Sequence, residues 1–209
     1  MAQSGLQFKK CREDRPCAKL PATQKGAGMA ERFDSLSEAH QRFIEAQKIF
    51  FVATAARDGR VNLSPKGHEA LKVLGPDEIL WLNLTGSGNE TAAHVQDINR
   101  ITLMWCAFEG PPRILRVYGT AEIVHPRDAA WNACAEALPP LTGARQYIRI
   151  KIDLVQTSCG YAVPLFDYQG ERPILLDWAE RKGAEGLAAY WEEKNTTSLD
   201  GLPTGIAGD

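Results

Sequence analysis

The stretch from Ile79 to Gly119 decides the fold. It opens with an apolar run and continues into a loop of glycines and hydroxyl-bearing residues: Ile79-Leu80-Trp81-Leu82-Asn83-Leu84, then Thr85-Gly86-Ser87-Gly88-Asn89-Glu90-Thr91. Residues 92–98 then show helical spacing. A strand that ends at such a loop and leads into a helix is suited to holding a phosphate group. Glycine lets the backbone come close, and the first N–H groups of the helix point at the anion.

The surrounding patterns predict a mainly β fold with flanking helices. Two strand-like runs, 101–108 and 113–118, are joined by Glu109-Gly110-Pro111-Pro112, and so short a turn implies antiparallel pairing. Gly119 is expected to form a bulge. Further strands are expected at 50–55, 60–64, 70–74, 120–124 and 147–155, with Pro65-Lys66-Gly67 ending the second of these. Helices are expected at 35–48, with a capping box that starts at Ser35, and at 127–138 and 173–194.

The chain is expected to divide into three parts. Residues 1–30 are polar and lack periodicity, so we expect a disordered N-terminal arm. Residues 31–160 form the β domain, and residues 161–209 form a helical and loop-rich tail packed on it.

Composition excludes several classes of partner. The 209 residues include 24 basic and 26 acidic side chains, for a net charge of -2, with no basic block of the kind that binds nucleic acid. No apolar run approaches the ~20 residues that span a bilayer, so no membrane association is expected. The N-terminus lacks the apolar core of a signal peptide, which predicts a cytoplasmic protein. The four histidines are widely separated and no Cys-x-x-Cys pair exists, so no metal site is predicted.

Two other interpretations of the glycine loop remain open at this point. Gly86 to Thr91 nearly matches a dinucleotide-binding fingerprint, although the short turn that follows does not suit a parallel sheet. The loop could also be a capped helix start without a ligand, because Ser, Thr and Asn are good capping residues. Residues 85–99 contain no Lys or Arg, so a phosphate there needs cations from elsewhere. Lys66 and Arg116 are the best candidates, although Arg116 could equally lie on the solvent face of its strand.

Four segments together resemble a known family. Residues 62–67, 85–94, 100–105 and 112–119 are similar to the FMN-binding split-barrel proteins related to pyridoxamine 5'-phosphate oxidase. The resemblance covers residues 35–160. It implies an antiparallel split β-barrel that forms a homodimer and binds FMN at the subunit interface.

The resemblance also implies a set of cofactor-binding residues. The segment from Asn62 to Lys66 would lie along the flavin and its ribityl chain, and Leu84 to Thr91 would surround the phosphate, with Arg116 approaching from a neighbouring strand. The complete set is Asn62, Ser64, Pro65, Lys66, Leu84, Thr85, Gly86, Ser87, Gly88, Asn89, Glu90, Thr91 and Arg116. True pyridoxamine phosphate oxidases carry an Arg-Lys pair in this loop, where this chain has Asn89, Glu90 and Thr91. The resemblance is therefore to another branch of the family.

By this resemblance the protein is an FMN-dependent oxidoreductase that transfers hydride or electrons between FMN and a small organic substrate. No catalytic side chain is identified, because the flavin ring itself carries such chemistry. His68, two residues beyond Lys66, could face the flavin or lie in a surface turn. The alternatives are a flavin-binding or sensing protein without turnover, and a related barrel that uses deazaflavin or haem.

Overall fold

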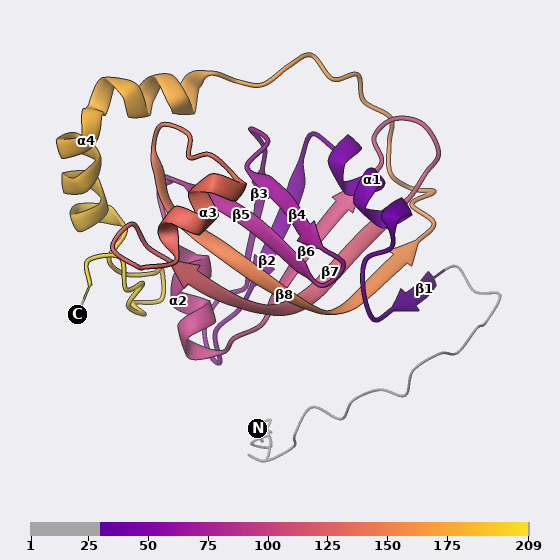
Figure 1. The fold of residues 1–209 in the computed structure, drawn as a ribbon, viewed down its shortest axis with the longest axis horizontal. Coiled ribbons are helices and arrows are strands. Elements are labelled where there is room, and N and C mark those ends of the chain that lie inside the picture. The colour runs from indigo at the N-terminus through magenta and orange to yellow at the C-terminus, as the bar shows by residue number, and fades with distance from the viewer. Residues whose placement is uncertain (1–29, 209) are drawn as a thin grey trace, which may run out of the picture.

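A computed structural model describes residues 30–208 (Figure 1). The expected disordered arm lies outside the described residues except for Ala30. The strands are β1 Ala30–Phe33, β2 Phe50–Thr54, β3 Asn62–Lys66, β4 Leu71–Gly75, β5 Glu78–Leu84, β6 Ile101–Cys106, β7 Ile114–Val124 and β8 Ala144–Ser158. The helices are α1 Glu38–Ala46, α2 Glu90–Asp97, α3 Trp131–Ala137 and α4 Ile174–Lys194.

The strands form one antiparallel sheet in the order β3-β2-β6-β7-β8-β5-β4, with β1 paired to β8. The end strands β3 and β4 do not pair with each other in the described part of the chain, so the curved sheet stays open along one side. The expected fold class, mainly β with flanking helices in an antiparallel split barrel, is confirmed.

The long strand β7 contains the expected bulge. The pairing of β7 with β8 shifts register between Tyr118 and Gly119. A side chain at Gly119 would overlap the Lys151 carbonyl on β8, so the bend needs a residue without a Cβ. The sequence predicted that the strand continues beyond a bulge or bend at Gly119, and the structure has one strand that bends there.

Other boundaries differ from expectation for identifiable reasons. Helix α1 is capped by Ser37, whose hydroxyl accepts from the His40 N–H while the His40 ring accepts from the Ser37 N–H, so the capping box does not start at Ser35. Pro65 does not end β3, because β3 is an edge strand, where a missing N–H costs no ladder bond. Helix α4 is kinked at Gly183, which has a φ of 64°.

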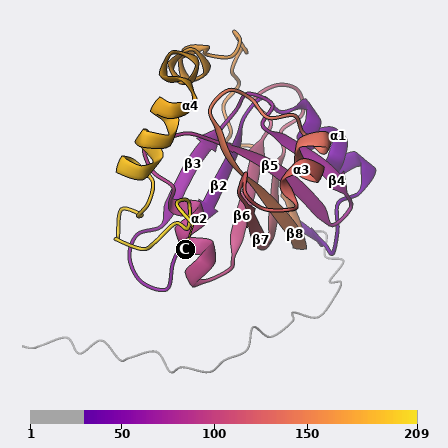
Figure 2. The same ribbon diagram turned by 60° about the vertical axis from the view of Figure 1, so that its left-hand side comes forward.

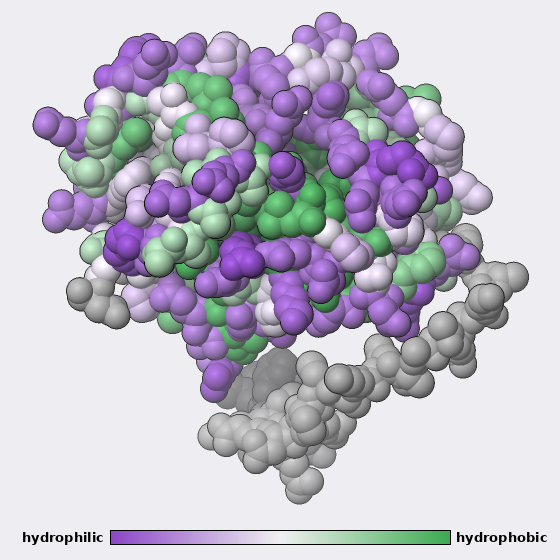
Figure 3. Space-filling model, in the orientation of Figure 1, coloured by the Kyte–Doolittle hydropathy of each residue, from purple (hydrophilic) through white to green (hydrophobic). Residues whose placement is uncertain are grey.

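The hydrophobic core fills the concave side of the sheet. Its aromatic centre is Phe50, whose ring lies 6.1 Å from the rings of both Trp81 and Trp105. Helix α2 closes one end by packing against β2 and β7. On the face seen in Figure 1, apolar surface gathers in the middle, between hydrophilic margins (Figure 3).

The residues that follow β8 travel back across the molecule. The linker from Cys159 to Pro173 passes over the top of the sheet and leads into α4, at the opposite side from α1 (Figures 1 and 2). The last residues then return to α2. The backbone N–H of Leu199 donates to both carboxylate oxygens of Glu90, at 3.0 and 3.1 Å.

Candidate functional site

One large cavity lies between the sheet and the C-terminal segments. Its volume is about 1390 Å³. The walls come from β3, from the end of β5 and the loop before α2, from the linker over residues 166–172, and from the end of α4 with the residues that follow it, 193–199. The cavity therefore joins segments that are far apart in the sequence.

The structure brings the predicted residues together at this cavity, with one exception. The lining includes Asn62, Ser64, Pro65, Lys66, Leu84, Thr85, Gly86, Ser87, Gly88, Asn89, Glu90 and Thr91. Arg116 does not line it. On β7, the Arg116 Nη1 donates to the Ser158 hydroxyl on β8 at 3.0 Å. Its role as a phosphate cation stays a prediction.

The glycine loop joins β5 to α2 as the sequence predicted. Asn89 is the N-cap of α2, but its side chain makes no capping hydrogen bond. Its Oδ1 accepts from Asn83 at 3.4 Å, and its buried Nδ2 has no partner in the described residues. The free N–H groups of the first helical turn and this amide are the donors that the loop can offer to an anion.

The loop hydroxyls differ in what they can do. Thr85 donates to the Gly143 carbonyl at 2.7 Å and accepts from the Trp191 indole at 2.8 Å, so it joins the loop to β8 and α4. Thr91 is buried and accepts from Asn62 Nδ2 at 3.4 Å, which leaves its proton free to be donated. Ser87 is exposed at the cavity edge.

Lys66 is a desolvated cation in the cavity. It ends β3, and its ammonium lies 5.5 Å from the centre of the Trp81 ring. Burial, followed by the positive charge of Arg145, lowers the pKa of Lys66 from 10.5 to about 8. A pKa in this range leaves the ammonium charged near neutrality and able to donate hydrogen bonds.

Arg145 is a cavity residue that the sequence analysis missed. It is the second residue of β8 and is only 4% exposed. Burial lowers its pKa to about 10. The only signal in the sequence is an arginine at the start of an apolar strand, and Arg149 gives the same signal on the same strand. Arg149 instead pairs with Glu78 at 2.7 Å and with Glu122 at 3.4 Å, outside the cavity.

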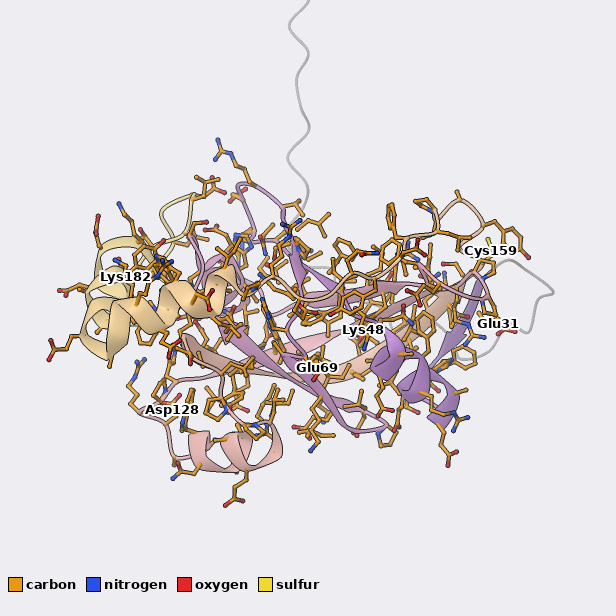
Figure 4. The ribbon with its side chains drawn as sticks, turned by 90° about the horizontal axis from the view of Figure 1, so that it is seen from above. Glu31, Lys48, Glu69, Asp128, Cys159 and Lys182 are labelled. Atoms are coloured by element: carbon orange, nitrogen blue, oxygen red, sulfur yellow. The ribbon has the colours of Figure 1, made fainter. Side chains whose placement is uncertain are left out.

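The linker forms the opposite wall of the cavity, and hydrogen bonds hold it in place. The Tyr168 hydroxyl donates to Glu171 at 3.0 Å, and the second carboxylate oxygen of Glu171 accepts from the His68 N–H at 3.3 Å. His68 and Glu69 have φ values of 61° and 52°, which is unusual for residues other than glycine. Seen from above, Lys48 and Glu69 lie near the middle of the molecule, where the linker crosses (Figure 4).

Within residues 30–208, no group of three or more His, Cys, Asp or Glu side chains is arranged to hold a metal ion. None of the helices described is both long and apolar enough to cross a membrane.

Comparison with known proteins assigns the family. The family model for pyridoxamine 5'-phosphate oxidase matches residues 36–159. A curated relative, the pyridoxamine 5'-phosphate oxidase family protein ustO of Aspergillus flavus, is 35% identical over 189 residues, covering 82% of this chain and 76% of the relative. This chain belongs to the pyridoxamine 5'-phosphate oxidase family. The matched segment contains β2 to β8 and the loop before α2.

The similarity of this chain to solved structures is weaker. HupZ of Group A Streptococcus is 19% identical, with a TM-score of 0.47, and the match covers 57% of this chain and 91% of HupZ. An FMN-binding protein from Syntrophomonas wolfei is 16% identical, with a TM-score of 0.44, and the match covers 61% and 85% of the two chains. The family assignment rests on the sequence matches alone.

Proposed function

We propose that this protein is an FMN-binding flavoprotein, and that it acts as an oxidoreductase transferring hydride or electrons between FMN and a small organic substrate. The observation that carries the proposal is the cavity. The residues that the family resemblance assigns to the flavin, the ribityl chain and the phosphate all line it, except Arg116. They come from two segments, 62–66 and 84–91, which are separated in the sequence and lie together only because of the fold.

The residues present suit FMN. A flavin ring is flat and apolar, and the cavity offers the Trp81 region and the β3 backbone for it. A phosphate is an anion, and the cavity offers Lys66, Arg145 and the unpartnered Asn89 amide. The volume of about 1390 Å³ exceeds the roughly 300–1,000 Å³ of common small-molecule pockets. There is space for a cofactor and for a second molecule beside it.

A bound flavin would supply the hydride or electron transfer, and the protein would position it. The Lys66 ammonium, above the Trp81 ring, would donate hydrogen bonds to a ligand in the cavity. The linker carrying Phe166 and Tyr168 forms a wall that limits the access of water. His68, whose backbone N–H donates to Glu171 on that wall, also lines the cavity.

The proposal includes a cytoplasmic homodimer. Exposed apolar side chains at the start of the edge strand β3 support association, since Val61, just before the strand, is 73% exposed and Leu63 is 65% exposed. The barrel of residues 31–160 would carry the cofactor. The tail of residues 161–209 would cover the phosphate end and the linker side of the same cavity.

The absorbance spectrum of the purified protein, followed by heat release and mass identification, tests this proposal. We expect FMN near one molecule per chain, or its uptake when added to flavin-free protein. A Soret band would point to haem, a deazaflavin mass would change the cofactor, and a protein that takes up none of these would refute the proposal. Reduction of the bound flavin by an electron donor, with reoxidation by an organic acceptor, separates an oxidoreductase from a flavin binder without turnover.

A further inference from the structure

Arg145 is a buried guanidinium without an acidic partner. Its Nη1 donates to Asn195 Oδ1 at 2.8 Å and its Nη2 to Asn83 Oδ1 at 3.4 Å, both neutral amide oxygens. Its Nε has no partner in the described residues, and no carboxylate lies within 4.0 Å of it. A buried charge is costly unless it is paired, so this arrangement is incomplete without an anion.

A second cation stands in the same cavity. Lys66 lines it together with Arg145, and the two positive charges repel each other. Four acidic residues also line the cavity, Glu90, Asp167, Glu171 and Glu193, but none of them lies within 4.0 Å of either cation, and the Glu90 carboxylate accepts from the Leu199 N–H with both oxygens. Two desolvated cations without a direct carboxylate partner favour an anionic ligand between them.

Arg145 also connects to the glycine loop from two sides. Through Asn83 it reaches Asn89, the N-cap of α2, whose Nδ2 is buried and unpartnered. Through Asn195 it reaches Gly86, since Asn195 Nδ2 donates to the Gly86 carbonyl at 3.1 Å. A single amide side chain thus links the guanidinium to each end of the loop. The free N–H groups of the first turn of α2 lie at the Asn89 end.

We infer that Arg145, with Lys66, supplies the positive charge that holds the phosphate of a bound flavin monophosphate against the glycine loop. This inference rests on the proposed function. The chain has no Lys or Arg between residues 85 and 99, and β8, the strand paired with β5, provides the missing charge. Arg145 therefore makes the site selective for a phosphorylated flavin over the same flavin without phosphate.

The competing explanation is structural, since Arg145 also joins β8 to the C-terminal segment through Asn195. Titration of flavin-free Arg145→Met with FMN and with riboflavin, followed by flavin fluorescence, separates the two. We expect the dissociation constant for FMN to rise about 10–100-fold, because a charge-assisted hydrogen bond set is lost. Riboflavin, which lacks the phosphate, should change less than about threefold. Arg145→Lys should recover part of the preference for FMN.

Arg149→Met is the matched control, because Arg149 lies on the same strand but outside the cavity. It should leave the ratio of the two affinities unchanged. Equal losses of FMN and riboflavin in Arg145→Met would overturn the inference, as would an unchanged FMN affinity. If Arg145→Met does not fold, Arg145→Lys gives the same comparison, and there a ratio equal to that of the wild type would overturn it.

Inorganic phosphate provides a test of the anion site that does not require flavin. Phosphate should raise the melting temperature of the flavin-free wild type, and should raise that of Arg145→Lys less. If the wild type binds no flavin but responds to phosphate in this way, the proposed function fails while the anion site stands. If the wild type binds flavin and neither phosphate nor the loss of Arg145 matters, the anion site fails alone.

Discussion

Replacing Lys66 by methionine should stabilise the flavin-free protein and weaken its hold on the cofactor. Burial, followed by the positive charge of Arg145, lowers the pKa of Lys66 from 10.5 to about 8. A shift of this size corresponds to about 3 kcal/mol by which the folded state disfavours the charged form. Methionine keeps the unbranched stem without the charge. The contact of the ammonium with the Trp81 ring, worth about 0.5–2 kcal/mol, offsets part of the gain.

We therefore expect Lys66→Met to raise the free energy of unfolding by about 1–3 kcal/mol at pH 7. Below pH 8 both the folded and the unfolded wild type carry the proton, so the full penalty is present. Between about pH 8 and 10.5 the unfolded state binds more protons than the folded state, and the wild type gains stability with rising pH at up to about 1.4 kcal/mol per unit. The advantage of the variant should therefore shrink as the pH rises through this range.

Urea unfolding of wild type and variant at pH 7, 8, 9 and 10 measures this difference. Lys151→Met is the control, because Lys151 is an exposed lysine of β8, and its effect should be small and constant with pH. A Lys66→Met protein that is less stable at pH 7, or whose advantage does not change with pH, would refute the reasoning.

Three further predictions concern the loop, the tail and the bend. Changing Ser87 and Thr91 together to alanine should weaken FMN binding by about 1–3 kcal/mol and riboflavin binding less, in fluorescence titrations; equal affinities for wild type and variant would refute it. Trp191→Phe removes the indole donor to Thr85 and should lower the free energy of unfolding by about 0.5–1.5 kcal/mol, measured by urea unfolding. An unchanged free energy of unfolding would show that this hydrogen bond does not stabilise the fold. Gly119→Ala should destabilise by several kcal/mol or prevent folding, because its Cβ would overlap a backbone carbonyl of β8; a soluble variant of normal melting temperature would contradict this.

The fold could be predicted because its signals are local. The apolar run from Ile79, the short turn at Gly110 and the bend at Gly119 each act through neighbouring residues, and the structure contains each of them. The end of the edge strand β3 was harder to predict. Proline has no N–H, so whether Pro65 ends β3 depends on whether a neighbouring strand needs a donor at that position, and that is a property of the whole sheet.

The cavity could be predicted only in part, because its charge comes from long-range packing. Arg145 and Arg149 lie four residues apart on β8, and the pairing with β5 shifts register at Arg145. Arg149 meets carboxylates, whereas Arg145 meets Asn195, fifty residues later in the chain. Likewise, no residue near Thr85 in the sequence indicates that the Thr85 hydroxyl accepts a hydrogen bond from the Trp191 indole. The C-terminal tail determines which polar groups of the barrel remain available to a ligand.

A crystal structure of the protein with FMN bound tests most directly whether this cavity is a flavin site. We predict a phosphate within hydrogen-bonding distance of the loop from Gly86 to Thr91 and of Arg145, with the flavin ring extending past Lys66 into the same cavity. Flavin density outside this cavity, or a phosphate far from the loop, would contradict it.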